Sequence, residues 1–542
     1  MVTIEQRKRV GQLFAVGFHD TTVNSAITSL IQDYHVGAVV LFKRNVRSAA
    51  QLRTLCHDLQ QLARDAGHAQ PLLLAIDQEN GLVTRIAPPV AAQLPGPMAL
   101  AATGSLDAAD AVADATADML RHFGINMNYA PVADVNSEPL NPVIGVRSPS
   151  DNPQTVARFA AACAKGMRGR TVVPCVKHFP GHGDTVTDSH YGLPRIDKNR
   201  EQLEATELLP FRQAVRDGIE MVMTAHIALP RITGDDTPST LSPRVLRILR
   251  DQFDFDGVII TDCLEMDGIR ATYGTVEGAL MALQAGVDSL MICHTYELQT
   301  AAIDRVCAAL ETGEIEHTRI NESLERIRAL KATFTNWGRA LQIRTDKALA
   351  AINARGAALA RKVYADSATV VRVQPGVFPV SPSARTVFVS PGPDVPVGGG
   401  GAVNSGDAAA AQPTRVPWVS SSFGDEIRAH CAALEEIRYT QRPLSDAQWA
   451  QIDEADVVLL ATRNAREAPY QHALGLEIAR RRGERVLISI ATCAPYDFLE
   501  EHAVRNVVVV YEPTLEAFRA AVDVIYDVET AKGKLPVAVK KI

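Results

Sequence analysis

VGAVVLF (residues 36–42) and PLLLAID (71–77) are two apolar runs on either side of a helical pattern at residues 48–66. Neither run alternates apolar with polar residues, which is typical of strands that are buried on both faces and therefore parallel. A strand, a helix and a second parallel strand make a βαβ unit. This segment therefore predicts one repeat of an α/β architecture.

The same pattern recurs through the first two-thirds of the chain. Helical patterns separate most of the runs, for example at residues 108–123, 155–168 and 200–217. Eight buried strands with helical connections predict a (β/α)8 TIM-type barrel, although an open doubly wound sheet is the alternative that this pattern leaves open. The remaining runs are at 12–18, 125–132, 171–179, 220–227, 257–263 and 287–293.

A smaller α/β unit follows the barrel. A long helical stretch, roughly 301–364, leads to a second series of strand patterns, and helical patterns separate the last of these. We therefore predict a barrel over residues 1–340, a helical linker over 341–365 and a C-terminal α/β sandwich over 366–542. Residues 391–413 are rich in Gly, Pro and Ala, so we expect a flexible loop there. The predicted strands are at 369–373, 386–390, 455–462, 485–492 and 504–512.

The composition excludes several classes of protein. The chain has 542 residues, 46% of them hydrophobic, and a formal net charge of −7. We expect a folded protein without a nucleic-acid or membrane partner, because there is no basic excess and no apolar run of membrane-spanning length. The amino-terminal segment lacks the apolar core of a signal peptide, which predicts a cytoplasmic location. The eight cysteines form no CxxC pair, which favours reduced thiols over disulfides or a zinc site.

Polar residues gather where the predicted barrel strands end. In a barrel these positions face one mouth, which is where active sites are built. Polar residues are also common in loops, so the clustering is suggestive only. The residues are Lys43, Asp77, Asp134, Lys177, His178, His226 and Asp262.

The segment from Lys177 to Arg195 contains the densest group of side chains that could act in catalysis or bind a ligand. It brings three histidines, two aspartates and a lysine into a loop punctuated by glycine. A metal site is disfavoured because Lys177 would repel a cation and helical ligand spacing is absent. The second interpretation is structural: the side chains of His182 and Asp184 shape the loop by hydrogen bonding to its backbone. Acid–base chemistry is the third interpretation, since Asp188 could fix the tautomer of the His190 imidazole.

Asp262 follows Ile259, Ile260 and Thr261 in the apolar run at residues 257–263. A carboxylate at the end of a buried strand is costly unless water or a partner reaches it. It could cap the following helix, or it could be a nucleophile exposed at the barrel mouth. Position alone does not separate these two interpretations.

KHFPGHGDTVTDSHYGLP (residues 177–194) closely resembles the signature of β-N-acetylglucosaminidases of glycoside hydrolase family 3. Shorter segments resemble the same family in the same order along the chain. The resemblance is dense in the barrel and thin after residue 365. These segments are DQE (77–79), IGVRS (144–148), MTAH (223–226), TDCLEM (261–266), APYD (494–497) and GKLPV (533–537).

The resemblance implies roles for nine residues. Asp262 matches the nucleophile, His190 the general acid/base and Asp188 its dyad partner. The other positions match residues that hold the hydroxyls of the terminal sugar or support that subsite: Asp77, Arg85, Arg147, Lys177, His178 and His226.

Three positions depart from the family's pattern. Asn80 replaces the first glycine of the usual Gly-Gly, and Pro149 stands where an aromatic residue usually follows Arg-Ser. Cys263 follows the nucleophile position where an acidic residue is common. None of these changes removes a catalytic group.

The implied function is exo-hydrolysis of terminal, non-reducing β-linked N-acetylglucosamine from chitooligosaccharides or peptidoglycan-type fragments, without a metal or organic cofactor. Alternatives are a β-glucosidase of the same family, an N-acetylglucosaminide phosphorylase or an inactive sugar-binding protein. Phosphorolysis is considered because a neutral imidazole repels an incoming phosphate less than a carboxylate would. The sequence leaves the oligomeric state and the leaving group open.

Overall fold

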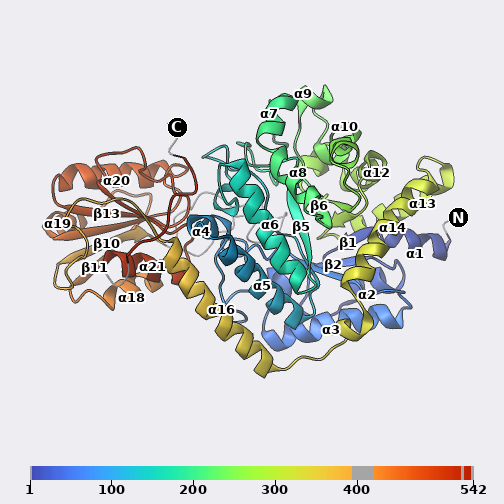
Figure 1. The fold of residues 1–542 in the computed structure, drawn as a ribbon, viewed down its shortest axis with the longest axis horizontal. Coiled ribbons are helices and arrows are strands. Elements are labelled where there is room, and N and C mark those ends of the chain that lie inside the picture. Colours follow the sequence, from blue (N-terminus) through green and yellow to red (C-terminus); the bar gives the residue numbers. More distant parts are fainter. Residues whose placement is uncertain (1–2, 393–419, 527–529, 539–542) are drawn as a thin grey trace.

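The computed structural model describes residues 3–392, 420–526 and 530–538, and eight parallel strands form its first unit (Figure 1). The strands follow the order β7-β6-β5-β4-β3-β2-β1-β8. Ile260 in β7 forms a parallel bridge with Ser289, next to β8, and this bridge closes the ring. The strands are β1 Phe14–Val16, β2 Ala38–Leu41, β3 Leu73–Ile76, β4 Met127–Asn128, β5 Val173–Phe179, β6 Met221–Thr224, β7 Val258–Thr261 and β8 Leu290–Ile292.

Every residue of these eight strands is buried, as the unbroken apolar runs predict. The barrel is confirmed, and the open sheet is wrong because β7 and β8 meet. The main helices around the ring are α1 Ile4–Gly11, α2 Ser25–Gln32, α3 Ala49–Asp65, α5 Leu106–Phe123, α6 Pro153–Gly169, α8 Leu208–Arg216, α12 Thr275–Ala285, α13 Tyr296–Thr312 and α14 His317–Phe334.

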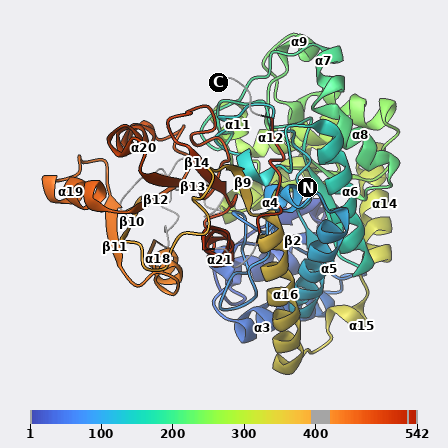
Figure 2. The same cartoon turned by 60° about the vertical axis from the view of Figure 1, so that its left-hand side comes forward.

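The second unit is a six-stranded sheet with helices on its faces, seen in orange and red beside the barrel (Figures 1 and 2). Its order is β11-β10-β12-β13-β14-β9, and only β9 is antiparallel to its neighbour. The elements are β9 Thr369–Arg372, β10 Thr386–Pro391, α18 Ser420–Arg428, β11 Leu434–Tyr439, α19 Asp446–Glu454, β12 Val457–Thr462, α20 Pro469–Arg482, β13 Val486–Ala491, β14 Asn506–Val509 and α21 Leu515–Ile525.

The strand β11 was not among the predicted strands. Its sequence, LEEIRY, carries three charged residues, and only two of its six positions are buried because it lies at the sheet edge. The loop predicted at 391–413 lies, from residue 393 onward, outside the described residues. The helical stretch predicted at 301–364 is divided among α13, α14, the short α15 (Trp337–Ala340) and α16 (Asp346–Ser367).

The helix α16 includes most of the predicted linker and joins the two units. It packs against α5 and α4 (Pro97–Ala102) of the barrel and against α21 of the second unit, and it lies along α5 in Figure 2. It therefore packs on both units rather than only spanning the gap between them. The domain limits drawn from the sequence stay predictions. None of the described helices has both the length and the apolar character that a membrane crossing requires.

The buried carboxylate of Glu512 links the second unit to the barrel through two hydrogen bonds. It accepts a hydrogen bond from the Tyr364 hydroxyl of α16 at 2.7 Å and another from the backbone N–H of Gly96, next to α4. A larger residue at Gly96 would press against this carboxylate, since an added Cβ would lie 3.0 Å from it. Burial raises the pKa of Glu512 to about 7.

The raised pKa of Glu512 predicts that the free energy of unfolding depends on pH. Between its ordinary pKa of 4.5 and about 7, the folded protein holds a proton that the unfolded chain has released. The stabilisation is therefore complete below pH 4.5 and is lost as the pH rises through 7, a change of roughly 3 kcal/mol. Glu512→Gln mimics the protonated group, so its stability relative to wild type should increase from pH 5 to pH 8 in chemical unfolding. The exposed Glu484→Gln is the control, and an equal pH dependence in wild type and Glu512→Gln would contradict the assignment.

Candidate active site

A cavity opens at the carboxyl ends of the barrel strands, the mouth predicted from the sequence. Ionisable groups and methionines share its wall, so a polar ligand would meet both hydrogen-bonding groups and apolar surface. The residues that line it are Phe42, Asp77, Glu79, Val83, Arg85, Val143, Arg147, Lys177, His178, His182, Ser189, His190, Met223, Asp262, Cys263, Met266, Met291 and His294.

Asp262 lies directly after β7 and faces this cavity. Its Oδ1 accepts the backbone N–H of Cys263 at 2.7 Å, which fixes the carboxylate. Burial acts to raise the pKa of Asp262, but nearby imidazoles and this N–H outweigh it and hold the pKa below its usual value. The imidazoles belong to His178, His226 and His190. Asp262 is therefore an anion at neutral pH, as a nucleophile must be.

His190 and Asp188 form a hydrogen-bonded pair in the loop between β5 and α7 (Arg200–Ala205). The Nδ1 of His190 lies 2.7 Å from Oδ1 of Asp188, which also accepts the His190 backbone N–H at 2.9 Å. Burial acts to raise the pKa of Asp188, but its hydrogen bond to His190 and the imidazole charge hold it below the ordinary value. Because the ionised carboxylate binds Nδ1–H, Nε2 is left for proton exchange in the cavity.

A network of buried charges also contributes to the cavity wall. Lys177 places Nζ 2.7 Å from Asp77 and 2.6 Å from Glu79. Arg147 donates to both oxygens of Glu79, at 2.9 and 2.8 Å, and to the carbonyl of Val143 at 2.9 Å. Burial acts to raise the pKa of Glu79, but Arg147 and Lys177 hold it far below its usual value. Two carboxylates thus keep both cations charged and fixed at the cavity wall.

His178 is oriented from below by Asp134. Its Nδ1 lies 2.7 Å from Oδ2 of Asp134, and its Nε2 lies 3.4 Å from the guanidinium of Arg147. The same carboxylate accepts the backbone N–H of His182 at 2.7 Å. Although His182 also lines the cavity, its ring is hydrogen-bonded to Ser189 at 3.1 Å, and burial lowers its pKa to about 4. It therefore shapes the loop, as the sequence suggested.

The other predicted residues take different positions. Arg85 lines the cavity, 3.8 Å from Asp77. His226 does not line the cavity and donates from Nε2 to the carbonyl of Cys263 at 3.0 Å, so it supports the turn after Asp262. Lys43, one of the strand-end residues, is exposed and does not line the cavity.

The cavity residues that were absent from the predicted set include Glu79 and His294. Glu79 lies in the DQE segment, and the buried cations Lys177 and Arg147, from later parts of the barrel, require such a counter-charge. His294 follows the last barrel strand, where its position at the mouth could have identified it.

Asn80, at a position where the family usually has glycine, has φ +70°, a left-handed conformation that asparagine tolerates. Its amide donates to Thr116 at 2.9 Å.

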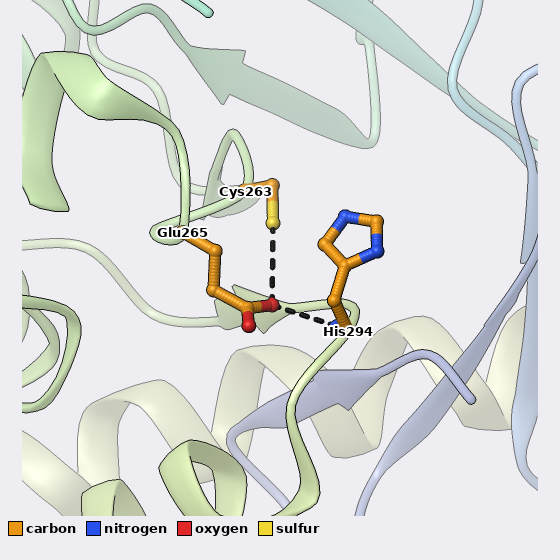
Figure 3. A group of neighbouring side chains, drawn as sticks. All are labelled: Cys263, Glu265 and His294. Carbon is orange, nitrogen blue, oxygen red and sulfur yellow. Dashed lines mark hydrogen bonds between the residues drawn. The ribbon is translucent and has the colours of Figure 1, made fainter. Parts of the chain in front are cut away.

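The described residues contain one group whose spacing could hold a metal ion, namely Cys263, Glu265 and His294 (Figure 3). It lies outside the Lys177–Arg195 segment, for which the sequence disfavours a metal site.

Comparisons with known proteins find relatives of the barrel and of the whole chain. The model of the glycosyl hydrolase family 3 N-terminal domain matches residues 5–330. The chain is 36% identical to β-hexosaminidase A of Pseudoalteromonas piscicida over 334 residues, which are 57% of this chain and 56% of that protein. It is 32% identical to β-hexosaminidase LpqI of Mycobacterium tuberculosis over 345 residues, 62% and 85% of the two chains. A solved family 3 β-N-acetylglucosaminidase from Paenibacillus sp. FPU-7 is 34% identical, with a TM-score of 0.86 and 98% of each chain covered.

The network around Glu79 predicts a large loss of stability when its carboxylate is removed. Glu79→Ala leaves the buried Arg147 without a counter-ion and Lys177 with only one. We expect a loss of about 3–5 kcal/mol in the free energy of unfolding, measured by urea denaturation. The exposed Glu277, which pairs with Arg305 at 2.8 Å, is the matched control. Glu277→Ala should cost about 1 kcal/mol or less, and equal losses would show that burial does not amplify the Glu79 pairs.

Proposed function

The chain belongs to glycosyl hydrolase family 3, and from this premise we propose that it is a retaining exo-β-N-acetylglucosaminidase. The observation that carries the proposal is one cavity that holds both an anionic Asp262 and the His190–Asp188 pair. A retaining glycosidase needs a nucleophile and a proton donor on either side of the glycosidic bond. The similarity to β-hexosaminidases supports the acetamido sugar as substrate. Because the chain spans only about half of the first relative, this activity is a proposal for the chain as a whole.

In the first step, a carboxylate oxygen of Asp262 attacks the anomeric carbon of the terminal sugar. The bond to the leaving oxygen breaks, and protonated His190 donates its Nε2 proton to that oxygen. Asp188 stabilises the charged imidazole through Nδ1–H. The product of this step is a glycosyl ester on Asp262.

In the second step, neutral His190 takes a proton from water. The resulting hydroxide equivalent attacks the anomeric carbon, and Asp262 leaves as a carboxylate. The two inversions together retain the β configuration. A histidine suits both steps because its ordinary pKa of about 6.5 allows it to give and take a proton near neutral pH.

The charge network binds the terminal sugar in this proposal. Asp77 accepts hydrogen bonds from sugar hydroxyls, and Lys177, Arg147 and His178 donate to them. Arg85 supports Asp77 at the cavity wall. Because each group is already held by a buried partner, little conformational entropy is lost when the sugar binds.

The substrates we propose are chitooligosaccharides or peptidoglycan-type fragments, and no step requires a metal or organic cofactor. The cytoplasmic location and the absence of nucleic-acid and membrane partners stay predictions of the sequence.

The first test compares hydrolysis of p-nitrophenyl β-N-acetylglucosaminide and p-nitrophenyl β-glucoside. We expect preference for the acetamido sugar and a loss of roughly 10²–10⁴-fold in kcat for chitobiose in His190→Ala. The loss in kcat/KM, which reports the first step, should be smaller for the aryl glycoside, because p-nitrophenolate leaves without a proton. Asp184→Asn is the control, since this carboxylate of the same loop pairs with Lys198 at 3.0 Å outside the cavity.

Several results would change the proposal. Preference for the glucoside would indicate a β-glucosidase, and no turnover of either substrate would favour a sugar-binding protein. A sugar 1-phosphate formed in phosphate buffer would indicate a phosphorylase. Equal chitobiose hydrolysis by wild type and His190→Ala would contradict the role of His190.

The covalent step has its own test. In His190→Ala the aryl substrate should still glycosylate Asp262, whereas attack by water should be slow, so the glycosyl-enzyme should accumulate. Intact-protein mass spectrometry should detect one added N-acetylglucosaminyl group, and peptide mapping should place it on Asp262. The double variant with Asp262→Ala should show no adduct, and an adduct on any other residue would overturn the nucleophile assignment.

A further inference from the structure

Three donor groups from two loops meet at one wall of the cavity. Cys263 and Glu265 lie after β7, and His294 lies after β8. One ligand atom from each residue lies within 4.8 Å of the others, and Figure 3 shows the thiol above the carboxylate with the imidazole beside them. A sulfur, an oxygen and a nitrogen donor form a set that suits a zinc ion.

The carboxylate of Glu265 is held in place by the backbone. It accepts the N–H groups of Cys293, His294 and Thr295, at 2.8, 2.7 and 3.0 Å. Two of these bonds go to Oε2 and one to Oε1, so Oε1 keeps a lone pair for a further partner. These bonds fix the loop after β8, and with it His294, beside the nucleophile's turn.

The other two donors have little competing hydrogen bonding. The Sγ of Cys263 makes a long contact of 3.9 Å with Oε2 of Glu265 and lies beside the thiol of Cys293. The imidazole of His294 packs near His19 and Phe42, with ring centroids 5.9 and 5.7 Å away. In the described part of the chain its ring nitrogens have no hydrogen-bond partner, although Cys263 and His294 both line the cavity.

We propose that Cys263, Glu265 and His294 bind a thiophilic divalent cation such as Zn²⁺, and that this cation inhibits the enzyme. On binding, Cys263 releases its proton to solvent and Sγ becomes a thiolate ligand. A ring nitrogen of His294 and a carboxylate oxygen of Glu265 are the other protein ligands, and the fourth position is open to water. Side-chain rotation draws the three atoms together to the shorter spacing of a tetrahedral site.

The position of the cation explains the inhibition. Cys263 is the next residue after Asp262 and donates its backbone N–H to that carboxylate at 2.7 Å. A divalent charge at the side chain of Cys263 attracts the carboxylate and competes with its attack on the sugar carbon. The inhibitory effect rests on the proposed function, whereas the binding itself does not.

Binding can be tested without activity. The full-length, reduced protein is titrated with Co²⁺, and a thiolate-to-cobalt charge-transfer band should appear in the near ultraviolet. Cys263→Ser should lose this band, and His294→Asn should weaken Co²⁺ binding at least about tenfold. Cys163→Ser, which changes a thiol of α6 outside this cavity, is the matched control and should retain the band. A wild-type protein without the band, or a Cys263→Ser variant that keeps it, would overturn the site.

Inhibition is tested by titrating Zn²⁺ against the hydrolysis rate, with each variant compared with its own metal-free rate. Cys263→Ser and His294→Asn should each need at least about tenfold more Zn²⁺ for half inhibition than wild type. Excess chelator should restore the wild-type rate. Equal sensitivity in all variants would show that the inhibitory ion binds elsewhere and would overturn the proposal. If no N-acetylglucosaminide were hydrolysed, the proposed function would fail while the cobalt spectrum still decided the site.

Discussion

The buried ion pairs among Glu79, Lys177 and Arg147 are the constraint on which the site depends. Each residue comes from a different part of the barrel mouth: Glu79 follows β3, Lys177 lies in β5 and Arg147 lies in the long loop after β4. An unpaired charge at such depth would cost several kcal/mol, so these segments are stable only when all three meet. The same pairing that holds the loops together therefore also leaves a fixed set of donors at the cavity wall.

The second unit extends this constraint beyond the barrel. Its Tyr496 accepts a hydrogen bond from Asn136 at 2.9 Å, in the loop that leads to Arg147. Glu512 binds Gly96, which follows the turn after β3. Both contacts reach segments that carry charged residues of the cavity, so the second unit supports the site although none of its described residues lines that cavity.

The barrel was predictable because buried parallel strands leave unbroken apolar runs, a signal that depends only on neighbouring residues. The strand β11 (LEEIRY) lacks this signal, because an edge strand keeps charged residues at its exposed positions. The strand-end residues Asp77 and Asp262 could be placed at one mouth from topology alone. The role of Glu79 could not be predicted from topology. It depends on the positions of Arg147 and Lys177, which are more than 60 residues away in sequence. His226 similarly acts through a backbone carbonyl, which no sequence pattern reveals.

His190 lies on a loop rather than at a strand end. That loop is held by contacts along its whole length: Asn141 donates to the carbonyl of His182 at 2.8 Å, and the ring of His182 lies 3.1 Å from Ser189. Gly183 packs so closely that a Cβ there would lie 1.7 Å from the carbonyl oxygen of Val135. A side chain at this position would push the loop away from the barrel and move His190 from the cavity. The glycine and histidine spacing of the 177–194 segment thus has a physical reason, because it converts a loop into a support rigid enough for acid–base chemistry.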